Sequence, residues 1–211
     1  MNRQEKLTLI LEEKIVAIIR SKVQSDVNQI IEALASSGIK ALEITSNTVG
    51  FMEEIKKARA KYPDILVGAG TITNTTLAKQ AVDAGAQFIV TPNTNTEVIK
   101  YAHLHELPVL MGALTPSEIC EAEAAGADVV KLFPSGTENI GIPYYKAVSA
   151  PLDNITLFAV GGIGLHNIKA WFEAGIQGVG VGGKLTTLNE NNTLEDIRNT
   201  AKQMLDIIKN F

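Results

Sequence analysis

The sequence predicts an α/β protein with a single domain over residues 1–211, a (β/α)8 TIM barrel that begins with a short N-terminal helix. A small residue, a glycine and a short apolar run recur together four times, and the glycines, which are 47, 41 and 49 residues apart, are Gly38, Gly85, Gly126 and Gly175. Each copy follows a helical pattern, so its glycine is expected to end a helix and lead into a strand. Each interval between copies has room for one further strand and helix, and a first strand near residue 14 brings the count to eight.

The expected elements alternate along the whole chain. Short apolar strands that alternate with helices are typical of a parallel sheet covered on its faces. An open doubly wound sheet is the alternative, although it usually has fewer units at this length. No Ser/Gly-rich or charged segment marks a linker, which favours one domain. The strands are expected at 14–19, 40–45, 65–70, 87–91, 108–111, 128–133, 155–160 and 177–181, each followed by a helix, the last of which is expected at 193–209.

Composition excludes several classes of partner. The chain has 19 Lys and Arg against 23 Asp and Glu, a net charge of -4, and no basic run, so no nucleic-acid partner is expected. Cys120 is the single cysteine and cannot form an internal disulfide, and charges interrupt the first 20 residues, which favours a cytoplasmic protein. The apolar runs, such as 15–19, are far shorter than the roughly 20 residues of a membrane span.

Lys131 is the strongest candidate for a catalytic residue. In a barrel of this kind the active site lies where the strands end, and Lys131 is the one cation in the apolar run 128–133. Side chains alternate along a strand, so Lys131 is expected inside the barrel with Val129 and Phe133. Burial there lowers the pKa of the ammonium, and a neutral amine can attack a carbonyl carbon. The alternative is a structural lysine that reaches solvent or pairs with a carboxylate.

Glu43 is the second candidate. It is the one charge in the apolar run 41–45, and the same alternation places it inside the barrel with Thr45. A carboxylate and an amine are therefore expected in one cavity. A buried ion pair without chemistry is the alternative, but such pairs are costly compared with apolar replacements, which favours a functional site.

Further residues at strand ends suggest binding of an acidic, phosphorylated substrate. Arg20 ends the first strand and Thr71 follows the third, and together they can bind a carboxylate. Glycine pairs follow the last two strands, where barrels often bind phosphate through backbone amides, and a cation stands next to the second pair. These residues are Gly161, Gly162, Gly182, Gly183 and Lys184.

Metal chemistry is not expected. His103 and His105 share one helix and His166 lies in a distant loop, so no histidines and carboxylates converge with the spacing of metal ligands.

Six short motifs follow one another along the chain: Glu43–Thr45, Gly68–Thr71, Thr91–Pro92, Thr115–Glu118, Lys131–Pro134 and Gly161–Ile163. Taken in this order, they resemble the bacterial 2-keto-3-deoxy-6-phosphogluconate / 4-hydroxy-2-oxoglutarate aldolase family over nearly the whole chain. The resemblance implies a class I aldolase on a trimeric barrel, in which Lys131 forms a Schiff base with the keto carbon of pyruvate and Glu43 moves protons. It also implies that Thr71, Pro92 and Phe133 line the pyruvate pocket.

Three positions depart from the family's pattern. Asn47 stands where many members have an arginine for the substrate carboxylate, although other members end strand one with an arginine, which Arg20 matches. Val160 replaces a threonine before the first glycine pair, and Lys184 replaces a serine after the second. These changes concern the preferred aldehyde and leave the Schiff-base chemistry intact.

The expected activity is cleavage of a 2-keto-4-hydroxy acid without a metal or organic cofactor. The expected reactions are 2-keto-3-deoxy-6-phosphogluconate to pyruvate and glyceraldehyde 3-phosphate, 4-hydroxy-2-oxoglutarate to pyruvate and glyoxylate, or both. A phosphosugar epimerase or isomerase on the same barrel is one alternative, which would need paired acid/base groups or a metal and no essential lysine. A non-catalytic sugar-phosphate sensor is another, which would keep the glycine loops without needing Lys131.

Overall fold

Eight parallel strands close into a barrel in the computed structural model, which describes residues 1–136 and 140–211. Each strand pairs with the next along the chain, and the eighth pairs with the first. The predicted barrel is therefore confirmed, and the open sheet is excluded. The strands are β1 Ile15–Ile19, β2 Ala41–Thr45, β3 Leu66–Gly70, β4 Ile89–Val90, β5 Val109–Ala113, β6 Val129–Leu132, β7 Leu157–Val160 and β8 Gly178–Val181.

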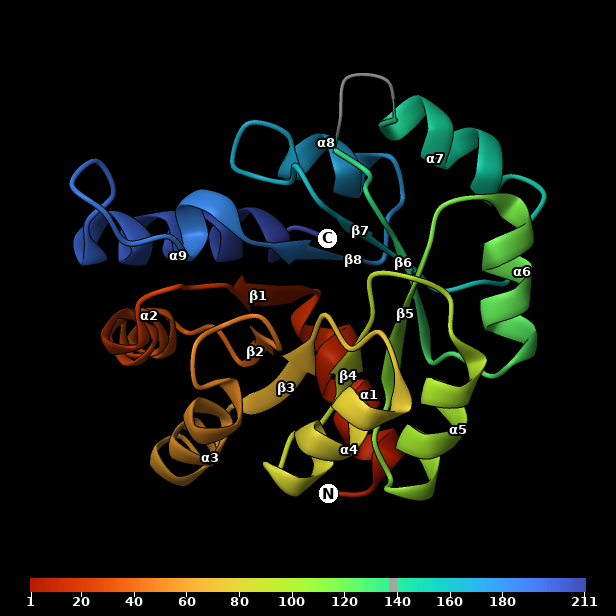
Figure 1. Cartoon of the computed structure of the whole chain (residues 1–211). Helices are drawn as coiled ribbons and strands as arrows, with labels where there is room; N and C mark the ends of the chain where they lie inside the picture. Colours follow the sequence, from red (N-terminus) through yellow and green to blue (C-terminus); the bar gives the residue numbers. More distant parts are fainter. Residues whose placement is uncertain (137–139) are drawn as a thin grey trace.

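Helices surround the ring of strands (Figure 1). Polar side chains cap several of them, as at Asn74 and Thr115, where the side-chain oxygen accepts a backbone N–H of the first turn. The four repeated glycines end their helices with positive φ angles, as the sequence predicts. The helices are α1 Arg3–Glu13, α2 Gln24–Ser36, α3 Phe51–Lys61, α4 Thr75–Asp83, α5 Thr96–Leu104, α6 Pro116–Ala124, α7 Ile142–Ser149, α8 Ile168–Glu173, the 3-10 helix η1 Gly183–Leu185 and α9 Leu194–Ile208.

Three of the repeated turns share a side-chain hydrogen bond. The residue two positions after the glycine carries an oxygen that accepts the backbone N–H at the start of the preceding strand. The bond gives a hydrogen-bond partner to a backbone N–H at the N-terminal end of the barrel. The bonds run from the N–H of Val67 to Gln87 at 2.9 Å, of Val109 to Asp128 at 2.8 Å and of Leu157 to Gln177 at 3.1 Å. The fourth turn has Lys40, whose side chain has no acceptor.

Alternation along the strands separates an inner core from an outer one. Inward residues such as Val129 and Phe158 fill the lower part of the barrel, whereas Val130 and Leu132 pack against the helices. Large and branched side chains make the inner layer a packed core rather than a pore.

Helix α1 closes the N-terminal end of the barrel. Its Ile10 is fully buried within the inner core, against Val16 and Leu66 among others. Lys6 donates a hydrogen bond to the carbonyl of Glu106 at 2.7 Å, which ties the helix to the turn before β5. The helix lies against β1, and Figure 1 shows it inside the ring of outer helices. Within the described residues, no helix is both long and apolar enough to span a membrane.

Removal of the Ile10 side chain tests this role of α1. Ile10→Ala should lower the free energy of unfolding by about 2–5 kcal/mol, because it leaves a cavity under the inner core. Leu104→Ala is the control, since Leu104 is 82% exposed. Urea denaturation of both variants measures the difference, and equal stabilities would show that α1 does not contribute to the core.

Candidate active site

A cavity of about 290 Å³ opens at the C-terminal ends of the strands. It brings together ten of the eleven residues that the sequence predicts for the site, all except Lys184. Ile18 and Gly180, which the sequence analysis did not select, also line it because they face inward at the ends of β1 and β8. The lining consists of Ile18, Arg20, Glu43, Thr71, Pro92, Lys131, Phe133, Val160, Gly161, Gly162, Ile163, Gly180, Gly182 and Gly183.

Lys131 lies on β6 with its side chain inside the barrel, where it is 5% exposed. Its Nζ is 4.7 Å from the centre of the Phe133 ring, a distance that permits a cation–π contact. Burial lowers the pKa of Lys131, and the nearby charge of Glu43 partly opposes this effect. The amine is therefore more easily deprotonated than an exposed lysine.

Glu43 reaches the same cavity from β2 and is 2% exposed. Burial raises the pKa of its carboxyl, while the charges of Lys131 and Arg20 act in the opposite direction. Within the described part of the chain, neither head group of the Glu43 and Lys131 pair forms a hydrogen bond or a direct ion pair. Both groups are thus available to a bound molecule.

Gly70 at the end of β3 makes room for Glu43. A Cβ atom built on Gly70 would overlap the Glu43 carboxylate. Any larger residue at position 70 would therefore collide with the Glu43 side chain in its present conformation. The sequence analysis quoted this glycine within a motif but assigned it no function. A glycine facing inward next to a charged strand position is the signal that could have identified it.

Arg20 and Thr71 border the cavity on the side of the first three strands. Arg20 is exposed at the end of β1, and its charge affects the pKa values of both Glu43 and Lys131. Thr71 has a φ of 58°, which is rare for a β-branched residue and is often found where a site constrains the backbone. Its carbonyl accepts a hydrogen bond from the Ser46 hydroxyl at 2.9 Å.

Pro92 enters the cavity from the loop after β4. That loop passes so close to β5 that a Cβ atom on Gly112 would collide with the Pro92 backbone. Gly112 therefore allows the loop to lean inward.

The two glycine pairs form the other side of the cavity. Gly161 and Gly162 both have positive φ angles, 92° and 76°. In the described part of the chain, the backbone N–H groups of Gly162, Ile163 and Gly183 donate no hydrogen bond. Such amides can bind an anion.

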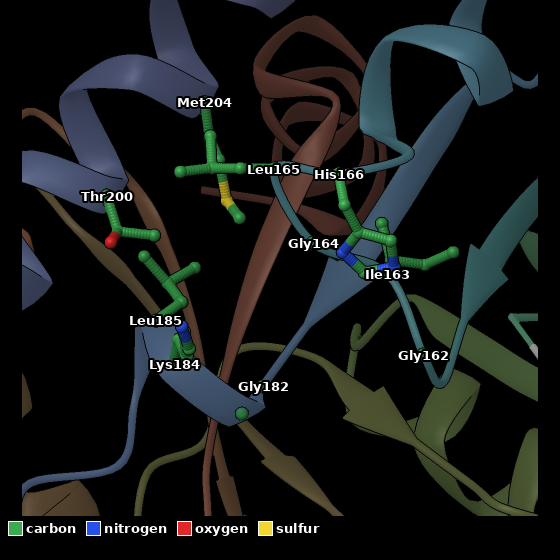
Figure 2. A pocket seen from close by; sticks show the side chains of 11 residues that line it. Gly162, Ile163, Gly164, Leu165, His166, Gly182, Lys184, Leu185, Thr200 and Met204 are labelled. Carbon is green, nitrogen blue, oxygen red and sulfur yellow. The ribbon is translucent and has the colours of Figure 1, made fainter. Parts of the chain in front are cut away.

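Lys184 lies outside this cavity. It is exposed and lines a neighbouring cavity of about 440 Å³, together with His166, Leu185 and Met204 among others. Figure 2 shows segments 162–166 and 182–185 on opposite sides of this second cavity. Lys184 belongs to η1, which the chain enters at Gly183. Gly162, Ile163, Gly182 and Gly183 border both cavities.

No group of three or more His, Cys, Asp or Glu side chains within the described residues could hold a metal ion.

The family described as KDPG and KHG aldolase matches residues 7–200 of the chain. The chain belongs to this family. It is 34% identical to the 2-dehydro-3-deoxy-6-phosphogalactonate aldolase of Escherichia coli, over 100% of this chain and 98% of that protein. It is 31% identical to the 2-dehydro-3-deoxy-phosphogluconate aldolase of Haemophilus influenzae, over 98% of each.

A solved structure supports the same assignment. The KDPG aldolase of Legionella pneumophila, with pyruvate captured as a covalent carbinolamine, is 26% identical and has a TM-score of 0.78 over 96% of this chain and 95% of that one. The chain is therefore an aldolase, a carbon–carbon lyase, which decides against the epimerase, isomerase and sensor alternatives.

The buried Glu43 and Lys131 should reduce stability. Because both charges lose hydration on folding, Glu43→Leu combined with Lys131→Met should raise the free energy of unfolding by about 1–4 kcal/mol. Glu97→Leu with Lys100→Met is the control for an exposed pair, 2.7 Å apart, and should change stability by about 0.5 kcal/mol or less. Denaturant titrations compare the two, and a destabilised Glu43/Lys131 double variant would show that the pair supports the fold.

Proposed function

We propose that the protein is a class I aldolase that uses Lys131 as its Schiff-base nucleophile. The observation that carries this proposal is a buried lysine in the cavity at the strand ends, whose pKa burial lowers, together with an equally buried carboxylate in the same cavity. The Legionella relative supports it, because its pyruvate is held as a covalent carbinolamine. The reaction needs no metal or organic cofactor, since the iminium that Lys131 forms with the substrate accepts the electron pair that cleavage releases.

The proposed reaction begins at the neutral amine of Lys131. The amine adds to the C2 keto carbon of the substrate to form a carbinolamine, which loses water to give a protonated Schiff base. The Glu43 carboxylate takes the proton of the C4 hydroxyl, the C3–C4 bond breaks, and its electron pair moves into the iminium to form an enamine. The C4 fragment leaves as an aldehyde. Protonation of the enamine at C3 and addition of water then release pyruvate and free Lys131.

The cavity supports a substrate with anionic groups at both ends. Arg20 and Thr71 would bind the carboxylate next to the keto group, and Pro92 and Phe133 would form the apolar wall of the pyruvate subsite. The amides of the two glycine pairs would bind a terminal phosphate, with Lys184 adding positive charge from the second cavity.

The proposed substrate is a 2-keto-3-deoxy-6-phosphohexonate, with glyceraldehyde 3-phosphate as the aldehyde product; 4-hydroxy-2-oxoglutarate, which gives glyoxylate, is a second substrate. The two relatives are named for the gluconate and galactonate forms of the hexonate, so both belong in the assay. We further propose a homotrimer, as the resemblance implies, that acts in the cytoplasm, as the single cysteine and the charged first 20 residues favour.

Borohydride trapping tests the covalent step. Incubation with pyruvate and borohydride should fix one reduced adduct on Lys131, because only this amine combines burial with access to the cavity among those that the structure describes. Lys131→Ala should abolish the adduct, whereas Lys100→Ala, a change at an exposed lysine, should leave it intact. Peptide mapping identifies the site, and an adduct on any other lysine would overturn the mechanism.

Replacement of Glu43 tests the proton transfer. Glu43→Gln should slow cleavage by roughly 10² to 10⁴, while trapping with pyruvate persists. Because the Glu43 charge raises the pKa of Lys131, its removal should also shift the rise of trapping rate with pH to lower pH. Near-normal turnover, or a shift to higher pH, would contradict this role of Glu43.

A further inference from the structure

The side chain of Asn167 spans the loop that follows β7. Its Nδ2 donates to the carbonyl of Gly162 at 2.9 Å, and its Oδ1 accepts the N–H of Gly164 at 2.9 Å. Asn167 is also the residue before α8, where an asparagine usually caps the helix. Here its side chain makes no capping bond to α8, so its bonding groups are used on the loop instead.

These bonds fix the direction of two peptide units. In a planar trans peptide the C=O of one residue and the N–H of the next point in opposite directions. The carbonyl of Gly161 accepts the Gly136 N–H at 2.6 Å, so the N–H of Gly162 points away from Gly136. The carbonyl of Gly162 points at Asn167, so the N–H of Ile163 points away from Asn167.

Both oriented amides border the catalytic cavity. Gly162 and Ile163 line it, and neither amide donates a hydrogen bond within the described residues. Gly161 and Gly162 have positive φ angles, and a glycine backbone can adopt many other conformations at little cost. The hydrogen bonds to the Gly161 and Gly162 carbonyls therefore hold the loop in this conformation.

We infer that Asn167 is a positioning residue that makes the enzyme selective for phosphorylated substrates. It touches neither the reacting carbon nor Lys131; it holds the Gly162–Gly164 loop so that the amides of Gly162 and Ile163 converge on the terminal phosphate. This inference rests on the proposed function, because it assigns the phosphate to that loop. 4-Hydroxy-2-oxoglutarate also ends in an anion, but its second carboxylate is bonded directly to C4 and lies several bonds short of the position of a 6-phosphate, so its cleavage should not depend on Asn167.

Asn167→Ala separates this role from a general structural one. It should lower kcat/KM for the 6-phosphorylated hexonate by about tenfold or more, chiefly through KM, because charge-assisted bonds to the phosphate are lost. The kcat/KM for 4-hydroxy-2-oxoglutarate should stay within about twofold, as expected when the lost contact involves only phosphate. Asn74→Ala is the matched control: Asn74 precedes α4 and its side chain accepts the Leu77 N–H of that helix. It should preserve the ratio of the two kcat/KM values.

Binding of inorganic phosphate gives a readout that does not need turnover. Calorimetric titration should show weaker phosphate binding in Asn167→Ala than in the wild type and in Asn74→Ala, with pyruvate trapping on Lys131 unchanged. Equal losses on both substrates, or unchanged phosphate binding, would overturn the role of Asn167. Failure of the wild type to trap pyruvate would instead refute the proposed function, while the phosphate titration would still decide whether Asn167 orients the loop.

Discussion

Burial of the Lys131 ammonium costs hydration and lowers its pKa, and the proposed role of Lys131 as a nucleophile depends on this cost. The residues around Lys131 keep water away from its ammonium. Phe133 covers one side of the ammonium, and the inner core below, which α1 closes, keeps water from reaching the strand from the N-terminal end. Glu43 offsets part of the cost, but it is itself deprived of solvent, so the pair remains unsatisfied until a substrate binds.

The barrel separates these conflicting demands along its axis. The N-terminal half is packed with large side chains such as Phe88 and Phe158 and supplies stability. The C-terminal half has inward-facing glycines, including Gly70 and Gly112, which leave space for the Glu43 side chain and for the loop that brings in Pro92. A closed parallel barrel allows this division because every strand ends at the same face.

The repeated turns and strand alternation explain most of what the sequence could predict. The eight strands follow from the repeated glycines and the short apolar runs, and the inward direction of Lys131 and Glu43 follows from the alternation of side chains along a strand. Lys184 was harder to place, because it follows two glycines whose many allowed conformations leave its direction undefined. Asn167 could not be found at all from local sequence, since an asparagine before a helix is usually a cap and only the folded loop shows its different bonds.

The hydrogen bonds made by Gln87, Asp128 and Gln177 divide the barrel into units. Each bond joins the start of an odd-numbered strand to the turn that leads into the next strand. The pairs β3 and β4, β5 and β6, and β7 and β8 are therefore each linked by a hydrogen bond of their own. One gene segment that encodes such a pair of strands with its two helices contains both the donor and the acceptor of the bond. Duplication of that segment, or its exchange with that of a relative, would therefore keep the bond. The near-constant spacing of the repeated glycines is the trace that growth by such duplication would leave in the chain.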